Sequence, residues 1–277
     1  MSVLNMNFES QYLKSNHEIT IILPNKPPHI PAKEYYNDSR KYKVLWLLHG
    51  TFGDHSDWLR KTNIELYACE KDLIVVMPSA LNSNYSNWSS SMLGFDMYDY
   101  LTEELMPMVY NWFPASDKRE DNFIAGLSMG GRGTIKYAVN YPGKFAAAAV
   151  LSAAPVNMEH LTEADLLQDD PMSQRLRGMV MNAGGLDTFI HSNENVWSII
   201  DSLADSDRLP RLLFACGTED TLIYDNLKLF KDHAQEIGLE AEFWTLDGYG
   251  HEWRFWDLAI QYALDFFGLE NTEHRPF

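Results

Sequence analysis

A serine framed by glycines is the part of this sequence with the clearest potential for chemistry. Gly126-Leu127-Ser128-Met129-Gly130-Gly131 lies between an apolar run and a segment with helical periodicity. A serine on a sharp strand-to-helix turn has strained backbone angles and needs small neighbours two positions before and after it. The helix that follows directs its first N–H groups at charge developing near the serine. The pattern predicts that Ser128 is a nucleophile, with a structural glycine-rich turn as the alternative.

The base that such a serine needs must come from elsewhere in the chain. A serine hydroxyl is a weak nucleophile until a base takes its proton, and no histidine is close to Ser128 in the sequence. His251 follows two glycines, after the last predicted strand and before the last predicted helix, which gives the chain order Ser…Asp…His. We therefore expect His251 to be the general base. His49 is expected to support a loop, and His17 is among the histidines expected at the surface.

The acid that orients the histidine should follow a strand located between the serine and the histidine. Asp220 meets this condition, because it follows the apolar run at residues 211–216 after only a short turn. Its neighbour Glu219 remains an alternative, as does Asp187, which follows a pair of glycines in a polar stretch. We expect Asp220 to hold the imidazole tautomer and to stabilise the imidazolium ion.

Two backbone N–H groups are needed to stabilise a tetrahedral oxyanion. Met129, the residue after the nucleophile, supplies one. The loop after the apolar run at residues 42–48 reads His49-Gly50-Thr51-Phe52-Gly53, and we expect Thr51 to supply the other. One such donor contributes about 3 kcal/mol to transition-state stabilisation.

Aromatic residues accompany the predicted site. Trp58, Trp88, Phe95 and Trp253 fall in loops at the expected edge of the sheet. These four side chains are candidates for binding substrate, by stacking on a sugar or packing on an acyl chain, although a place in the core is favoured for any one of them. No spacing typical of metal ligands occurs, and no metal is expected.

Apolar runs predict the elements that position these residues. Strands are expected at residues 17–23, 42–48, 72–77, 121–125, 145–152, 211–216 and 241–246, and helices at 95–113, 132–141, 223–237 and 252–267. Strands alternating with helices are typical of an α/β fold with a mostly parallel sheet. Residues 156–210 are polar and prone to form helix. We predict a single domain over residues 1–277, in which 156–210 is a helical insertion that caps or flanks the site.

Composition restricts the classes of partner and location. The 277 residues are 45% hydrophobic, and the formal net charge is −17. The chain therefore lacks the basic surface that binds nucleic acid, and polyanionic substrates are disfavoured. The longest apolar run, residues 145–155, is too short to cross a bilayer, and no secretory signal is apparent. With only Cys69 and Cys216, both in apolar surroundings, we expect a reduced cytoplasmic protein.

Together these motifs resemble the esterase D-like ("putative esterase") family of α/β-hydrolases, and within it the bacterial tributyrin esterases and acetyl esterases. The resemblance extends from residue 47 to residue 256 and rests on the segments LLHGTFGDHSDWLRKTN, DLIVVMP, GFDMYDYLTEEL, FIAGLSMGGRGTIKYA, CGTEDTLIYDN and GHEWRFW. It implies an α/β-hydrolase sheet without a cofactor. It also implies Ser128, Asp220 and His251 as a catalytic triad, with Thr51 and Met129 at the oxyanion positions.

The resemblance further implies hydrolysis of short-chain acyl esters, so that the expected partner is a small ester molecule. Relatives act on acetylated or feruloylated sugars or on S-formylglutathione, and related acyltransferases exist. A thioesterase or acyltransferase reaction is therefore the alternative, and a non-catalytic binding protein is a remote one. The first loop departs from the family pattern at Thr51-Phe52 and Asp54, which bears on the acyl pocket. The sequence leaves open whether the chain forms a homo-oligomer.

Overall fold

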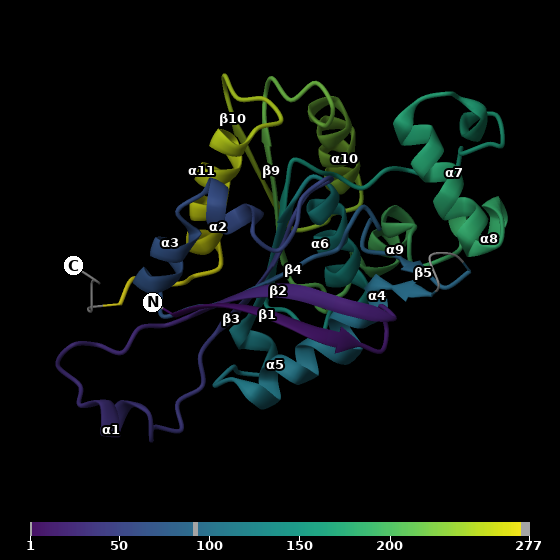
Figure 1. Cartoon of the computed structure of the whole chain (residues 1–277). Coiled ribbons are helices and arrows are strands. Elements are labelled where there is room, and N and C mark those ends of the chain that lie inside the picture. Colours follow the sequence, from purple (N-terminus) through teal and green to yellow (C-terminus); the bar gives the residue numbers. More distant parts are fainter. Residues whose placement is uncertain (1, 91–93, 273–277) are drawn as a thin grey trace.

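The computed structural model describes residues 2–90 and 94–272, and an eight-stranded sheet lies at its centre (Figure 1). The strand order is β1-β2-β4-β3-β7-β8-β9-β10. β2 is antiparallel to both of its neighbours, and all other adjacent strands are parallel. The strands are β1 (Ser2–Ser10), β2 (Ser15–Leu23), β3 (Val44–Leu48), β4 (Ile74–Pro78), β7 (Asn122–Leu127), β8 (Ala147–Leu151), β9 (Arg211–Gly217) and β10 (Ala241–Leu246).

The predicted mostly parallel sheet is therefore confirmed. All seven expected strands occur, and none of their ends is displaced by more than two residues. β1 was not predicted, because it is an edge strand whose side chains alternate only between exposed and half-buried. Such weak alternation is hard to distinguish from a loop.

Alternate side chains of the central strands face two separate cores. On β3, Val44, Trp46 and Leu48 face one core, whereas Leu45 and Leu47 face the other. This period of two is the geometry of a strand buried on both faces. The first core is covered by α5 (Met106–Trp112), α6 (Met129–Asn140), α9 (Val196–Leu203) and α10 (Tyr224–Glu236), and the second by α3 (Ile64–Glu70) and α11 (Trp253–Phe266).

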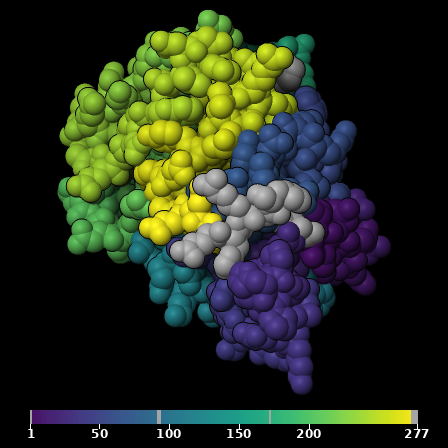
Figure 2. Space-filling model, turned by 90° about the vertical axis from the view of Figure 1, so that its left-hand side faces the viewer, coloured from purple at the N-terminus to yellow at the C-terminus, as the bar shows by residue number. Residues whose placement is uncertain are grey.

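Short helices at the second face were not predicted. α2 (Asp57–Lys61) and α3 lie beside α11 on the face that Figure 2 presents, in blue and yellow. The Asn63 backbone N–H joins them by donating to Asp257 Oδ1 at 3.1 Å. These helices, like α1 (Ala32–Tyr35), have four to seven residues, which is too short for a recognisable helical period.

The longer predicted helices are observed with one exception. α6, α10 and α11 correspond to the expectations at 132–141, 223–237 and 252–267. The expected helix at 95–113 is interrupted: Phe95–Asp96 is strand β6, which pairs with β5 (Asn87–Trp88). It is followed by α4 (Met97–Asp99), a π-helix at Tyr100–Leu105 and then α5. Helical spacing of apolar residues did not reveal the change of hydrogen-bond pattern along this segment.

The chain between β8 and β9 forms helices and, within the described residues, no strand, as expected. α7 (Pro171–Ala183) and α8 (Leu186–Ile190) stand at the upper right of Figure 1, and α9 returns to pack on α6. A small core of Leu166, Met179, Val180 and Phe189 stabilises α7 and α8. Arg175 of α7 contacts Thr51 in the loop after β3, so this segment lies beside the carboxyl end of that strand.

Three further expectations concern single residues and membrane association. Cys69 and Cys216 are both buried and unpaired, as expected. His17, expected at the surface, is buried on β2 with 6% of its area exposed, because β1 and the π-helix cover it. In the stretches 2–90 and 94–272, no helix is both long and apolar enough to span a membrane.

Candidate active site

Ser128 occupies a strained turn between β7 and α6. Its φ is 53° and its ψ is −114°, outside the regions that residues with a side chain ordinarily adopt. The Ser128 backbone N–H donates to the Leu151 carbonyl of the neighbouring strand at 2.8 Å, which holds this conformation in place. The turn leaves Ser128 half-buried at the carboxyl edge of the sheet, at the N-terminus of α6.

The glycines around Ser128 are required by the close approach of backbones. A Cβ added to Gly126 would lie 2.5 Å from the Gly130 carbonyl oxygen. A Cβ added to Gly130 would lie 2.5 Å from the Leu48 carbonyl oxygen and 2.6 Å from that of His49. Neither glycine has a positive φ, so the absence of a side chain matters here, not backbone freedom.

His251 lies in the loop between β10 and α11 and contacts the serine. Its Nε2 is 2.9 Å from Ser128 Oγ. The imidazole packs edge-on against Trp256, with ring centroids 5.0 Å apart, and 22% of the side chain is exposed. The imidazole and the hydroxyl are therefore in hydrogen-bond contact at a position that a substrate can reach.

Asp220 follows β9 and holds the other side of the imidazole. Its Oδ2 is 2.7 Å from His251 Nδ1, and its Oδ1 accepts the backbone N–H groups of Leu222 at 3.1 Å and Ile223 at 3.2 Å. The side chain is fully buried. Burial alone raises the pKa of Asp220, but the hydrogen bond and charge of His251 and the Leu222 N–H outweigh burial and hold the pKa below its ordinary value. The carboxyl group is thus ionised at neutral pH.

The two other carboxylates considered for this role lie elsewhere. Glu219 is exposed, and Asp187 pairs with His191 on the surface of α8, with 3.5 Å between Oδ1 and Nδ1. In the described part of the chain, neither forms a hydrogen bond with His251. The structure therefore brings Asp220, and not its alternatives, to the imidazole.

The loop after β3 lies against the serine. A Cβ added to Gly50 would lie 3.5 Å from Ser128 Cβ. Beneath the loop, His49 Nε2 accepts the Ala80 N–H at 2.8 Å, which leaves Nδ1–H to donate to the Gly50 carbonyl at 2.6 Å. Burial lowers the pKa of His49, so the ring is neutral. His49 supports the loop, as expected from the sequence.

Two backbone N–H groups near Ser128 are the candidates for stabilising an oxyanion. Within residues 2–90 and 94–272, neither the Thr51 nor the Met129 N–H donates a hydrogen bond. The neighbouring Phe52 N–H is occupied, because it donates to Asn82 Oδ1 at 2.8 Å. The two groups proposed from the sequence for an oxyanion are thus the ones that remain available.

Substrate binding is wrong for two of the four aromatic candidates, Trp58 and Phe95, which have the core position that the sequence favoured for any one of the four. Trp58 is 1% exposed, and its indole N–H donates to the Leu48 carbonyl at 3.0 Å, so it fills the core beneath the loop. Phe95 is 5% exposed and belongs to the first core. Trp253 is half-buried against Trp58, and Trp88 is half-buried near α7, with its indole N–H donated to the Ser83 carbonyl. None of the four lines the cavity described next.

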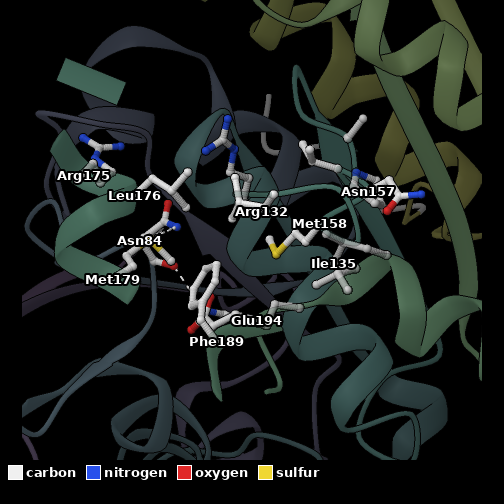
Figure 3. Close-up of a pocket in the computed structure, with 16 residues that line it drawn as sticks. Asn84, Arg132, Ile135, Asn157, Met158, Arg175, Leu176, Met179, Phe189 and Glu194 are labelled. Atoms are coloured by element: carbon white, nitrogen blue, oxygen red, sulfur yellow. Dashed lines mark hydrogen bonds and ion pairs between the residues drawn. The ribbon is translucent and has the colours of Figure 1, made fainter. Parts of the chain in front are cut away.

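A cavity of about 230 Å³ lies between α6, residues 154–158, α7 and α8 (Figure 3). Ser128 and His251 are not part of its lining. It is connected to the site through Arg175 of α7, whose Nη1 donates to Thr51 Oγ1 at 3.1 Å. Most of the lining is apolar, contributed by Ile135, Ala154, Pro155, Val156, Met158, Leu161, Leu176, Met179, Phe189 and Val196.

Sequence reasoning missed the charged residues of this cavity. Lys136 is 2% exposed, and its Nζ lies 2.9 and 3.0 Å from the Glu194 carboxylate oxygens and 2.8 Å from Ser86 Oγ. Burial lowers the pKa of Lys136, and Glu194 opposes this shift. Arg132 and Lys136 are four residues apart on the helix that follows Ser128, so they share one helical face. Two cations with helical spacing, the only charged residues between positions 129 and 140, were the signal that could have revealed them.

Comparison with known proteins assigns the chain to a family. Residues 10–260 match the family described as "Putative esterase". The acetyl esterase of Caldicellulosiruptor saccharolyticus is 30% identical over 267 residues, which cover 96% of this chain and 97% of that protein.

Solved structures show the same relationship. Fluorophosphonate-binding serine hydrolase F of Staphylococcus aureus is 32% identical, with a TM-score of 0.78 over 96% of this chain and 98% of that one. The S-formylglutathione hydrolase of Staphylococcus aureus is also 32% identical, with a TM-score of 0.77 and the same coverage. A ferulic acid esterase of Anaeromyces mucronatus, at 16% identity and a TM-score of 0.61 over 99% of this chain and 91% of that one, shares the fold. The chain thus belongs to the "Putative esterase" family, and it is a serine hydrolase of the carboxylic ester hydrolase class with an α/β-hydrolase fold.

Proposed function

We propose that the chain hydrolyses esters of short-chain carboxylic acids, with Ser128 as nucleophile, His251 as general base and Asp220 as the acid that orients the base. One observation carries this proposal: hydrogen bonds of 2.7 and 2.9 Å connect Asp220, His251 and Ser128 without interruption. The similarity to an acetyl esterase supports a short acyl group.

Acylation of the serine is the first step. Ser128 Oγ attacks the ester carbonyl while His251 Nε2 takes the hydroxyl proton. The carbonyl oxygen becomes an oxyanion, which the N–H groups of Thr51 and Met129 stabilise because neither has another acceptor among the described residues. The tetrahedral intermediate then collapses. The bond to the alcohol oxygen breaks, and the imidazolium returns its proton to that oxygen.

Deacylation repeats this sequence with water. His251 takes a proton from water, whose oxygen attacks the acyl-enzyme, and the second oxyanion forms at the same N–H groups. Collapse releases the carboxylic acid and returns the proton to Ser128. The buried Asp220 carboxylate stabilises the imidazolium in both steps, because its low pKa keeps it ionised.

Replacement of the nucleophile tests the proposal. Ser128→Ala should abolish hydrolysis of p-nitrophenyl acetate and labelling by a fluorophosphonate probe, which reacts rapidly only with an activated serine. The circular dichroism spectrum and the melting temperature should show that the variant is folded. Full esterase activity in a folded Ser128→Ala variant would refute the proposal.

Hydrolysis of a thioester is the second candidate function. Its support is the 32% identity to an S-formylglutathione hydrolase over nearly the whole of both chains. The same side chains would serve, with a thiolate in place of the alkoxide as leaving group. Values of kcat/KM for S-formylglutathione and p-nitrophenyl acetate, measured with one enzyme preparation, distinguish the two candidates.

A further inference from the structure

Two arginines of the cavity lining come close in sequence or in space to residues of the proposed site. Arg132 lies one helical turn after Ser128, and its backbone N–H donates to the Ser128 carbonyl at 3.0 Å. Arg175 reaches across from α7 and donates to the Thr51 hydroxyl. Figure 3 shows both guanidinium groups on the same side of the cavity, with Leu176 between them. Arg132 is therefore fixed in position by the helix that begins beside Ser128, and Arg175 by its contact with the loop after β3.

These guanidinium groups make the cavity cationic in an acidic protein. The cavity lining carries three cations and one carboxylate, and that carboxylate, Glu194, pairs with Lys136. Within the described residues, Arg175 forms no ion pair with an acidic side chain. Burial lowers the pKa of both arginines, and the charge of Arg175 lowers that of Arg132 further. The two like charges are close enough to repel, and an anion placed between them would relieve this repulsion.

The cavity interior is suited to the apolar part of a ligand. Its volume of about 230 Å³ exceeds the roughly 150 Å³ cavity that accommodates a benzene ring. One polar atom in the wall has no partner: Asn84 Oδ1 is buried and, within the described chain, accepts no hydrogen bond. An unsatisfied buried polar atom costs free energy that a ligand with a hydrogen-bonding group can recover.

We propose that Arg132 and Arg175 form a carboxylate-binding subsite, so that the enzyme prefers esters with an apolar body that enters the cavity and a carboxylate that binds the two guanidinium groups. Guanidinium groups bind carboxylates through charge-assisted, often bidentate hydrogen bonds. The inference rests on the proposed ester hydrolysis and specifies its substrate class. The carboxylate can belong to the acyl part or to the alcohol part of the ester.

Two matched substrate pairs test the subsite. The acyl side is probed with the p-nitrophenyl monoester of adipic acid against p-nitrophenyl hexanoate, and the alcohol side with 4-acetoxybenzoate against 4-acetoxybenzamide. Each kcat/KM is divided by the rate constant of alkaline hydrolysis of the same ester. We expect the anionic member of at least one pair to exceed its neutral partner about 10-fold or more, and the responding pair identifies the side that carries the carboxylate.

Replacement of one guanidinium group should remove this preference. Arg175→Gln should lower the ratio of anionic to neutral kcat/KM by about 10- to 100-fold, as expected for loss of a charge-assisted hydrogen bond. Arg175→Gln also removes the hydrogen bond to Thr51 Oγ1, which can slow hydrolysis of both substrates. The ratio of the two kcat/KM values remains informative, because such an effect applies to both. Arg175→Lys, which keeps the charge but not the planar fork, should retain part of the preference. Arg177→Gln on the same helix, outside the cavity lining, should leave the ratio unchanged.

The outcomes separate this inference from the proposed function. If the neutral esters are hydrolysed and Ser128 is labelled, but neither pair favours its anionic member, the subsite is absent while the esterase remains. An equal ratio in the wild type and in Arg175→Gln leads to the same conclusion. If the wild-type protein neither hydrolyses these esters nor reacts with the fluorophosphonate probe, the proposed function itself is contradicted.

Discussion

At the scale of single residues, burial differs between the three side chains of the site in the way that the proposed roles require. Asp220 is fully buried and fixed by two backbone N–H groups, whereas His251 is 22% exposed and Ser128 is half-buried. An orienting carboxylate needs a fixed position and a constant charge. A nucleophile and a proton carrier must reach the substrate.

Replacement of this carboxylate by an amide should affect catalysis more than folding. Asp220→Asn keeps the shape and the Oδ1 acceptor for Leu222 and Ile223, but it removes the charge that stabilises the imidazolium and selects its tautomer. We expect kcat for p-nitrophenyl acetate to fall by roughly 10⁴-fold, as the equivalent change does in serine proteases. Stopped-flow or prolonged steady-state assays measure the residual rate.

Glu219→Gln is the matched control, because it alters a carboxylate one residue away that is exposed. We expect kcat within about twofold of the wild type, since isolated surface substitutions have small effects. Loss of activity in Glu219→Gln with retention in Asp220→Asn would assign the orienting role to Glu219.

At the scale of elements, α6 connects the serine to the cavity. Its first turn follows Ser128 and ends near Arg132, and Lys136 lies one turn further along the helix. The N-terminus of α6 can approach the loop after β3 only because Gly130 has no side chain. One helix thus positions the proposed nucleophile, a proposed oxyanion N–H and two of the cavity cations.

Addition of a methyl group should disturb this packing. A Cβ in Gly130→Ala would collide with the Leu48 and His49 carbonyls, so we expect a loss of about 1–3 kcal/mol of unfolding free energy in urea. Gly143→Ala is the control, because a Cβ there meets no atom within 4 Å, and it should change stability by less than about 0.5 kcal/mol. Equal stability of the two variants would contradict the steric explanation.

The ion pair between α6 and the turn before α9 should also contribute to stability. Glu194→Gln leaves the Lys136 ammonium, whose side chain is 3% exposed, without its carboxylate. Removal of one partner from a buried pair typically costs about 3–5 kcal/mol. Because Glu194 retains 14% exposure, we expect the lower end of this range in urea unfolding. The double variant Lys136→Met/Glu194→Leu should be more stable than Glu194→Gln, because it leaves no unpaired charge. If Glu194→Gln instead loses less unfolding free energy than the double variant, the result would argue against a buried pair.

At the scale of the whole molecule, the net charge of the chain and the charge of the cavity lining have opposite signs. The chain carries −17 overall, yet cations predominate around the cavity beside Ser128. The overall charge repels anions at long range, which is the basis of the sequence-based expectation against polyanionic substrates. A subsite for a single carboxylate acts within a few ångströms, where the guanidinium groups outweigh the distant carboxylates.

Stability should fall as the pH is lowered, in part because of His17. Burial lowers the pKa of His17 from 6.5 to about 4, while Ser79, His49, His55 and Glu104 contribute less. Between these values the unfolded chain binds a proton that the folded chain does not, so the free energy of unfolding decreases from pH 6.5 down to pH 4. The shift corresponds to about 3 kcal/mol at about 1.4 kcal/mol per pKa unit.

The variant His17→Gln lacks this imidazole and therefore isolates the contribution of His17 to the pH dependence of stability. The difference in unfolding free energy between pH 7 and pH 4.5, measured in urea, should be smaller in His17→Gln than in the wild type. His49 contributes in the same direction in both proteins, because its pKa is also lowered by burial. An identical pH dependence in the two proteins would mean that His17 is accessible to protons in the folded state.

The sequence by itself determined the sheet and the residues around the serine. Buried parallel strands are continuous apolar runs, and a Gly-x-Ser-x-Gly turn follows from local backbone sterics, so both are visible in a short window. The same holds for His49-Gly50-Thr51, which follows a strand directly. Chain order then selected His251 and Asp220, although Glu219 and Asp187 remained alternatives.

Only the tertiary structure decided among those alternatives and revealed the cavity. Asp220 and His251 are 31 residues apart in sequence, and their 2.7 Å contact depends on how β9 and β10 pair. The sequence left both substrate binding and a core position open for Trp58 and Phe95, because the packing of each against a core depends on distant segments. Arg175 lies 124 residues from Thr51, in a stretch without a motif. Long-range contacts of this kind leave no period or spacing in the sequence, because they depend on how separate elements pack together.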